Sequence, residues 1–330
     1  MDSAGTCPLT AFDTLLNRNV PHILENIFSS LDYNSFKTCM KVNKTWREVL
    51  TTAPYQKILD KLLNEKWENE EKLYFASRDG NTEELRKLIS NLKVDVNFVT
   101  KYHHSTPLIT AVHGRHKEVV KLLLDAGAEV NKAHGDQFPL LEAARQGDED
   151  IVLMLLDAGA GTDINKHYST GRTPLWWTAH RGHLKLAKIL IEQGADPNKA
   201  DCNECTPLYV AASWGYTKVV QVLLEGGANP NLSDRYGVTP LLHKVAYEGH
   251  QSVVKLLLEG GSDPNKENIW GTTPLAVAAW YGRKEAVKKL MEGGADPDKA
   301  DRNGRTPLEG AKVNGHNEVV KVLLDGGAKH

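Results

Sequence analysis

The sequence lacks most of the features that catalysis, nucleotide binding or membrane insertion require. It has no Gly-rich nucleotide loop, no His-Glu-x-x-His metal motif and no G-x-S-x-G nucleophile turn. The formal net charge is −2 over 330 residues, which indicates neither a nucleic acid nor an acidic membrane surface as partner. No apolar run approaches the length of a transmembrane helix. These absences favour a protein that is not an enzyme and needs no cofactor.

Cysteine is also scarce. The four cysteines are Cys7, Cys39, Cys202 and Cys205. They are too few and too unevenly placed for a disulfide framework, which fits a reducing compartment. The N-terminus also lacks the basic head and apolar core of a signal peptide. We therefore expect an intracellular protein, cytoplasmic or nuclear.

A repeat accounts for most of the chain. The segment TPLYVAASWGYTKVVQVLLEGGANPNLSD, residues 206–234, recurs in close variants from Lys101 to the C-terminus. Its Thr caps a helix, its Pro occupies the first turn, and its V-V-x-L-L-L run gives a second helix an apolar face. One copy cannot bury that face alone, so successive copies must stack. The marker prolines are Pro107, Pro139, Pro174, Pro207, Pro240, Pro274 and Pro307.

A period near 33 residues carrying T-P-L, A-A-x-x-G-H and G-A-D-P-N resembles the ankyrin repeat. A degenerate copy at residues 73–97 precedes the seven clear ones, and we number these eight repeats in chain order. The resemblance implies an all-α solenoid of helix-turn-helix repeats with β-hairpin fingers. Two departures from the repeat pattern predict local differences in structure. Glu204 replaces a turn glycine and should be strained, and extra residues after Ala160 should lengthen a finger.

Residues 19–50 carry a different pattern. Pro21 begins a helix, aliphatic residues follow at helical spacing, and a Leu-Asp turn leads to two further short helices. This run resembles the F-box closely, with Val20 in place of the usual Leu. The resemblance implies a short three-helix domain that binds the Skp adaptor of a cullin–RING ubiquitin ligase. The adaptor-binding face would comprise Val20, Pro21, Ile23, Ile27, Leu31, Phe36, Val42 and Trp46.

The two patterns divide the chain into segments. We expect an N-terminal tail at 1–16, the F-box at 17–53, a linker helix at 54–71 and the ankyrin-repeat domain at 72–330. No Gly, Pro or Ser run separates the linker helix from the first repeat, so the connection should be stiff. Alternatively, the N-terminal helices only cap the first repeat, which would leave a protein-binding scaffold with no ubiquitin-ligase role.

Function in a solenoid resides on the side chains that stacking does not use, on the concave face and the finger tips. In repeats four to seven these positions are rich in Trp, Tyr and Arg, the residues that dominate interface energetics. The expected substrate-binding residues are Arg145, Arg172, Trp177, His180, Arg181, Trp214, Tyr236, Tyr247, Trp270, Trp280 and Tyr281. A basic group at one end, formed by Arg145, Arg172, His180 and Arg181, suggests an acidic or phosphorylated segment in the ligand. Trp176 is equally compatible with burial between repeats.

The sequence thus predicts the substrate-recognition subunit of a Skp–cullin–F-box ubiquitin ligase, whose partner subunits carry out the ubiquitin transfer. A second alternative, besides the scaffold, is a zinc-dependent enzyme, because Cys202 and Cys205 follow His180 and His183 at metal-like spacing. Against the enzyme, His183 is the ordinary Gly-His histidine of the repeat, and both cysteines fall on a finger turn. F-box–ankyrin pairings also occur in effectors that pathogens deliver into host cells, and the sequence leaves that context open.

Overall fold

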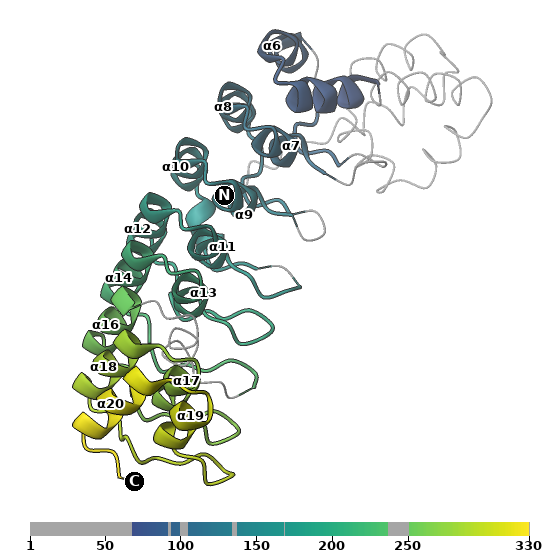
Figure 1. The fold of residues 1–330 in the computed structure, drawn as a ribbon. Helices are drawn as coiled ribbons and strands as arrows, with labels where there is room; N and C mark the ends of the chain where they lie inside the picture. Colours follow the sequence, from purple (N-terminus) through teal and green to yellow (C-terminus); the bar gives the residue numbers. More distant parts are fainter. Residues whose placement is uncertain are drawn as a thin grey trace, which may run out of the picture.

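The computed structural model describes residues 68–91, 94–99, 105–133, 137–167, 169–236 and 251–329, which form a curved row of helix pairs (Figure 1). The expected N-terminal tail, the F-box, most of the linker helix and Tyr247 lie outside the described residues. None of the helices among the described residues combines the length and the apolar character needed to cross a membrane.

The repeats consist of a first helix and a second helix wherever the structure describes both. The first helices are α7 (Pro107–His113), α9 (Pro139–Gln146), α11 (Pro174–Arg181), α13 (Pro207–Ser213), α17 (Pro274–Trp280) and α19 (Pro307–Val313). The second helices are α6 (Thr82–Asn91), α8 (Lys117–Asp125), α10 (Glu149–Asp157), α12 (Leu184–Glu192), α14 (Thr217–Glu225), α16 (Gln251–Glu259), α18 (Lys284–Glu292) and α20 (Asn317–Asp325). The second helices lie along one side of the row, and the first helices lie between them and the finger turns (Figure 1).

A single helix at residues 68–79 precedes α6 and forms the first helix of the degenerate repeat. Its Leu73 and Ala76 are buried in the same core as Leu85 of α6. This helix runs without a break across residues 71 and 72, where the linker helix was expected to meet the repeats. The unbroken helix from residue 68 onward supports a stiff connection between the end of the expected linker helix and the first repeat.

The Thr-Pro pair starts the first helices as predicted. In α13 the hydroxyl of Thr206 accepts a hydrogen bond from the backbone N–H of Tyr209 at 3.1 Å, and Pro207 follows in the first turn. Equivalent caps begin α7, α11, α17 and α19. Helix α9 follows Phe138, whose side chain cannot accept a hydrogen bond and provides no cap. The capping hydroxyl therefore fixes where most first helices begin.

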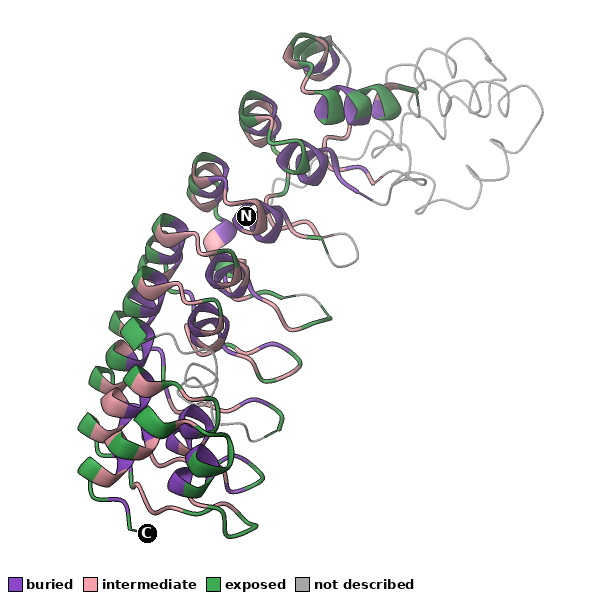
Figure 2. Ribbon diagram, in the orientation of Figure 1, coloured by how far each residue is buried: buried purple, intermediate pink, exposed green. Residues whose placement is uncertain are grey.

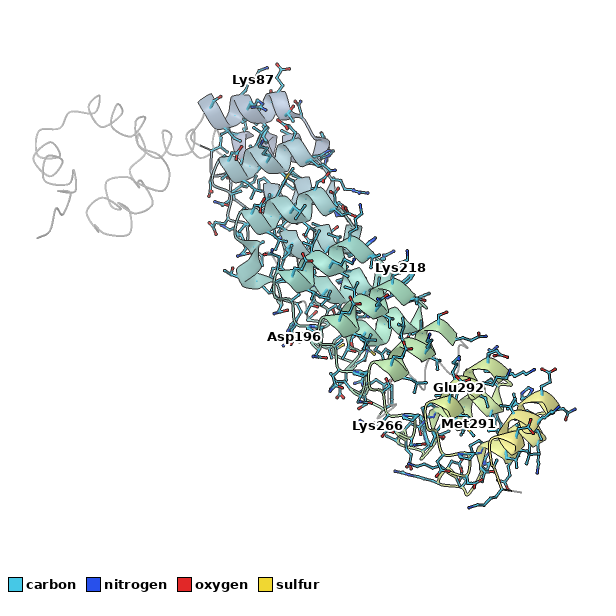
Figure 3. The ribbon with its side chains drawn as sticks, turned by 90° about the vertical axis from the view of Figure 1, so that its left-hand side faces the viewer. Lys87, Asp196, Lys218, Lys266, Met291 and Glu292 are labelled. Atoms are coloured by element: carbon cyan, nitrogen blue, oxygen red, sulfur yellow. The ribbon has the colours of Figure 1, made fainter. Side chains whose placement is uncertain are left out.

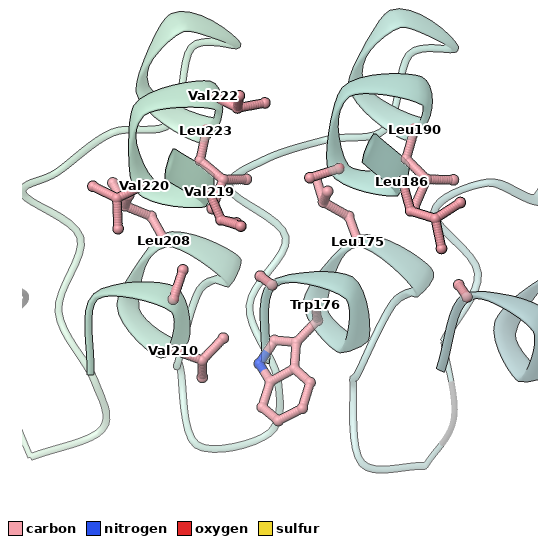
Figure 4. Packing of buried hydrophobic residues seen from close by; sticks show 14 of the residues in the cluster. Leu175, Trp176, Leu186, Leu190, Leu208, Val210, Val219, Val220, Val222 and Leu223 are labelled. Atoms are coloured by element: carbon pink, nitrogen blue, oxygen red, sulfur yellow. The ribbon is translucent and has the colours of Figure 1, made fainter. Parts of the chain in front are cut away.

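The core lies between the two layers of helices, whose facing sides are buried (Figure 2). Leu175 and Leu208 of the first helices pack toward Leu190 and Leu223 of the second helices, and all four are fully buried (Figure 4). Helices α9, α11 and α13 contact one another in order, as do α12, α14, α16 and α18, so one core runs through the described repeats. The predicted all-α solenoid is confirmed.

The outer face of the second helices is polar. Seen from that side, charged side chains such as Lys87, Lys218 and Glu292 cover it (Figure 3). The helical spacing of apolar residues in each second helix therefore produces one apolar face, which packs against the neighbouring helices, and one charged face, which contacts solvent.

Asparagines tie most repeats to the next. Asn198 accepts a hydrogen bond from the backbone N–H of Asn229 at 2.7 Å and donates one to the carbonyl of Gly227 at 3.1 Å. Asn231 and Asn265 repeat the arrangement. Asn131 keeps the bond to the carbonyl of the equivalent Gly159, at 3.4 Å, and also donates to the hydroxyl of Thr162 at 2.8 Å. Thr162 belongs to a short 3₁₀ helix, η1 (Ala160–Asp163), which follows α10 and is formed by the extra residues in place of the longer finger that was predicted.

The fingers are tight turns, and no β-strand is present in them among the residues that the structure describes. Neighbouring fingers are joined by single backbone hydrogen bonds, for example from the N–H of Cys202 to the carbonyl of Thr170 at 2.9 Å. Glu204 has φ of 63°, whereas Gly171, Gly271 and Gly304 hold this left-handed position in other fingers. The predicted strain at Glu204 is confirmed.

Candidate protein-binding surface

The surface formed by the first helices and the finger turns exposes large aromatic side chains, and we call it the inner surface. The exposed fraction is 58% for Trp214, 56% for Tyr236, 55% for Trp270, 42% for Tyr281 and 37% for Trp280. All five were predicted to be exposed, since ankyrin stacking uses other positions. Exposed rings of this size are unfavourable in water unless a partner covers them, so they mark a candidate protein-binding surface.

Trp176 belongs to the core and not to this surface. Only 3% of it is exposed, and it packs among the buried residues of α11 and α13 (Figure 4). Its indole N–H donates to the backbone carbonyl of Cys205 at 3.1 Å, which satisfies the polar end of the buried ring. Of the two possibilities that the sequence left open for Trp176, burial between repeats is therefore correct. The hydrogen bond of its indole links α11 to the next finger turn.

Around Trp176 the structure assembles a group that we call the aromatic cluster: Arg172, Trp176, Trp177, His180 and Trp214. The guanidinium carbon of Arg172 lies 4.3 Å from the Trp176 ring centroid and 5.3 Å from that of Trp177. The His180 ring stacks on Trp176 with centroids 5.1 Å apart and meets Trp214 edge-on at 5.6 Å. Arg172 is therefore held by cation–π contacts, and His180 bridges the rings of two repeats.

A hydrogen bond fixes the most exposed ring of the aromatic cluster. The indole N–H of Trp214 donates to Nδ1 of His180 at 3.2 Å. Burial, followed by the positive charges of Arg181 and Arg172, lowers the pKa of His180, which favours the neutral imidazole that can accept this bond. The remaining ring proton then resides on Nε2. The Trp214 ring is thus held by its edge with more than half of its surface exposed.

A second aromatic group lies nearer the C-terminus, and we call it the C-terminal patch: Trp270, Trp280, Tyr281, Arg302 and Arg305. The backbone N–H of Arg302 donates to the carbonyl of Trp270 at 3.1 Å, which joins two finger turns. The guanidinium of Arg305 lies 6.0 Å from the ring centroid of Trp280. A Cβ at Gly310 would lie 3.3 Å from the Trp280 ring, so the absence of a side chain there lets the ring pack closely on α19.

The basic group of the prediction is largely compensated within the protein. Arg145 makes two hydrogen bonds to Glu142, of 2.7 and 3.0 Å, on its own helix. Arg172 lies 3.6 Å from the buried carboxylate of Asp201. Arg181 is exposed, and no ion pair involving it is found among the described residues. The structure therefore brings Arg172 and His180 into one cluster, places Arg145 in a separate network and leaves Arg181 as the accessible charge.

The network around Arg145 depends on a buried acid. Burial acts to raise the pKa of Glu142, but hydrogen bonds from Arg145 and Gln146, the charge of Arg145 and a contact from His113 outweigh it and lower the pKa. Nδ1 of His113 lies 3.0 Å from the Glu142 carboxylate, which links α7 to α9. Glu142 is therefore a buried carboxylate held in its ionised form by its neighbours.

Sequence reasoning missed a hollow on the inner surface. It has a volume of about 290 Å³ and lies between the helix at residues 68–79, α7 and α9. Its lining includes Tyr74, Arg78, Ile109, His113 and Glu142. The only signal in the sequence was the unusual make-up of the first repeat, which has Lys72 in place of the marker proline.

The zinc alternative finds no support in the described residues. No three His, Cys, Asp or Glu side chains there are grouped closely enough to hold a metal ion. Burial, together with the negative charges of Asp201 and Asp234, raises the pKa of the Cys205 thiol to about 12. A zinc ligand must be a thiolate, so the environment of Cys205 opposes that role.

Comparisons with known families agree with both sequence patterns. A family model described as "Ankyrin repeats (3 copies)" matches residues 50–134, 140–234 and 242–330. A model of the F-box domain matches residues 18–55. No curated protein matches the chain. Both domains are non-catalytic interaction modules, so the chain carries the parts of a protein-interaction adaptor.

Proposed function

Because the chain belongs to the ankyrin repeat family and carries an F-box domain in the same polypeptide, we propose that it is the substrate-recognition subunit of a Skp–cullin–F-box ubiquitin ligase. The F-box binds the Skp adaptor through the face around Pro21, Ile27 and Leu31. The inner surface of the repeats binds a protein substrate. The cullin–RING partner subunits then transfer ubiquitin to a substrate lysine in the cytoplasm or nucleus.

One observation carries the proposal: two interaction modules of different kinds occur in one chain, and the second exposes a row of aromatic side chains. A scaffold needs no dedicated adaptor-binding module. A substrate receptor needs both modules and a stiff connection between them, so that the bound substrate faces the ubiquitin-charged enzyme. The unbroken helix at residues 68–79 supports such a connection.

The substrate-binding residues that we propose fall into two groups. Trp177, His180 and Trp214, with Arg172 and Arg181 beside them, form the first group. Trp270, Trp280 and Tyr281 form the second, and Tyr236 lies on the finger between them. An acidic or phosphorylated segment in the substrate would engage Arg181, because Arg145 and Arg172 are paired with Glu142 and Asp201.

The test is a pull-down of the purified full chain with the Skp adaptor. The comparison is a triple variant, Pro21→Ala, Ile27→Ala and Leu31→Ala, and the matched control is Trp214→Ala on the inner surface. We expect the wild type and the control to bind the adaptor and the triple variant to lose binding. No binding by the wild type would leave the ankyrin scaffold as the better account.

A further inference from the structure

The hollow between the helix at residues 68–79, α7 and α9 lies where repeat two has small residues on the inner surface. These three helices follow one another along the row of first helices (Figure 1). Thr110 lines the hollow at a position where the neighbouring repeats have Phe75 and Glu142. Gly114 lines it seven residues after the marker proline, at what we call the eighth position. The hollow therefore occupies space that larger side chains fill in other repeats.

Elsewhere on the inner surface, the side chain at the eighth position contacts the preceding repeat. The indole N–H of Trp214 in repeat five donates to Nδ1 of His180 in repeat four at 3.2 Å. The amide of Gln146 in repeat three donates to the backbone carbonyl of His113 in repeat two at 3.1 Å. Gly114 has no side chain for such a contact, so the side of repeat one that faces it stays uncovered at the hollow.

The backbone of repeat two is strained next to Gly114. Arg115, the following residue, has φ of 59°, in the left-handed region that favours glycine. In other repeats glycine holds this position: Gly147, Gly182, Gly215, Gly282 and Gly315. Repeat two has the glycine one position earlier, and the side chain of Arg115 bonds the buried carboxylate of Asp148 at 3.2 Å. Strained residues concentrate at functional sites, so this reversed order supports a role for the hollow.

Two side chains in the lining have groups to offer to a ligand. The guanidinium of Arg78 covers the Phe75 ring with one face, at 4.8 Å from the ring centroid, and 52% of the side chain is exposed. An aromatic ring can stack on the other face. Nδ1 of His113 lies 3.0 Å from the ionised carboxylate of Glu142, so Nδ1 carries a proton. In the neutral ring Nε2 is then a hydrogen-bond acceptor.

Both charges in the lining of the hollow already have partners. Arg78 donates to the two carboxylate oxygens of Asp79 at 2.7 and 3.3 Å. Glu142 accepts hydrogen bonds from Arg145 and Gln146. A neutral occupant is therefore favoured over a charged one, which would have no partner of opposite charge. The volume of about 290 Å³ equals that of about ten water molecules, which suits one large side chain of about ten non-hydrogen atoms.

We propose that the hollow binds one tryptophan or tyrosine side chain of a partner protein. The ring stacks on the open face of Arg78, and its N–H or O–H donates to Nε2 of His113. Tyr74 and Ile109, both buried, provide apolar contacts. This pocket lies outside both groups of substrate-binding residues proposed above. The inference rests on the proposed function, because the ring belongs to the protein substrate.

The probe is a phage library of random peptides of about seven residues, selected on the immobilised full chain and long enough to present one side chain with its flanks. The bound phage are then depleted on Thr110→Trp. This variant fills the hollow with the side chain that repeat four has at the same position, Trp177. We expect the remaining peptides to share one tryptophan or tyrosine. Remaining peptides without either residue, or equal capture by the wild type and Thr110→Trp, would overturn the inference.

A synthetic peptide of the selected type separates the contacts. Alanine in place of its aromatic residue should weaken binding at least about 30-fold, as expected for a hot-spot ring. Arg78→Ala should weaken binding at least about threefold, and Arg78→Lys, which keeps the charge but has no planar face, should not restore it. His113→Phe should weaken binding of this peptide and leave binding of its phenylalanine counterpart unchanged.

Lys218→Ala is the matched control, because Lys218 is exposed on the outer face of α14 (Figure 3), and it should bind as the wild type does. Circular dichroism checks that Thr110→Trp folds. Arg78 is exposed, so Arg78→Ala tests the inference even if Thr110→Trp does not fold, and unchanged binding to Arg78→Ala would overturn it.

This selection uses no ligase subunit, so its outcome is independent of adaptor binding. Selected aromatic peptides without adaptor binding would refute the ligase role and leave the pocket intact. Adaptor binding without such peptides would refute the inference and leave the ligase role intact.

Discussion

The left-handed backbone at Glu204 predicts that replacing this residue with glycine stabilises the protein. A side chain at φ near 63° costs about 1–2 kcal/mol, because Cβ crowds the following carbonyl oxygen. Glycine removes that cost but loses roughly 0.5–1 kcal/mol through its larger unfolded-state freedom. We therefore expect Glu204→Gly to raise the free energy of unfolding by about 0.5–1 kcal/mol.

Three control variants isolate the backbone effect. Glu204→Ala keeps the strained conformation and removes only the side chain, so it should change stability little. Gly304 has φ of 78°, and a Cβ there would meet no atom of the described residues within 4 Å, so Gly304→Ala should destabilise by about 1 kcal/mol through strain alone. A Cβ at Gly171 would lie 2.8 Å from the backbone nitrogen of Cys202, so Gly171→Ala should cost more than Gly304→Ala.

The assay is urea unfolding of the full chain followed by circular dichroism, combined with amide hydrogen exchange of the finger at residues 201–205. Hydrogen exchange is needed because a solenoid distributes a local change over neighbouring repeats and does not always unfold in one step. The reasoning is refuted if Glu204→Gly is no more stable than the wild type while Glu204→Ala is clearly less stable. That result would mean that the glutamate side chain makes a favourable contact that outweighs the strain.

Further predictions concern stability and pH. Trp176→Ala should destabilise the protein by about 3–5 kcal/mol in urea unfolding, whereas Trp214→Ala should change stability by less than about 1 kcal/mol, because only Trp176 is buried. Glu142→Gln should cost about 1–3 kcal/mol at neutral pH. Because the folded-state pKa of Glu142 is lowered, this difference should shrink as the pH falls below 4.5 toward the folded value, and a constant difference would contradict the account. The lowered pKa of His180 predicts that the folded state loses stability as the pH falls below 6.5. Protonation of His180 should also break the hydrogen bond from Trp214. The resulting change in tryptophan fluorescence should be absent in a Trp214→Phe variant.

The repeat period predicted the fold because the repeats carry the same kinds of capping, turn and apolar residues in the same order. The Thr-Pro pair determined where α13 begins, whereas α9 follows Phe138 and has no side-chain cap. A single residue out of pattern, Glu204, predicted a strained turn that the structure contains. Repetition makes such departures visible, because the other copies define what the backbone needs.

The charge state of the inner surface was harder to predict. Arg145 was read as part of a basic group, although Glu142 stands three residues before it, at a spacing that pairs side chains on a helix. The link from His113 to Glu142 joins residues of neighbouring repeats, and sequence spacing alone does not show it. The hollow near α7 was missed for a similar reason, since its volume depends on how three helices leave space between them.

The most direct test of the ligase proposal is a calorimetric titration of the full chain with the Skp adaptor. The account predicts a one-to-one complex for the wild type and for Trp214→Ala, and no measurable binding for the Pro21→Ala, Ile27→Ala, Leu31→Ala variant. Unchanged circular dichroism and an unchanged urea unfolding midpoint would show that the repeats of this variant are intact. Absence of binding by the wild type, or equal binding by the triple variant, would contradict the account.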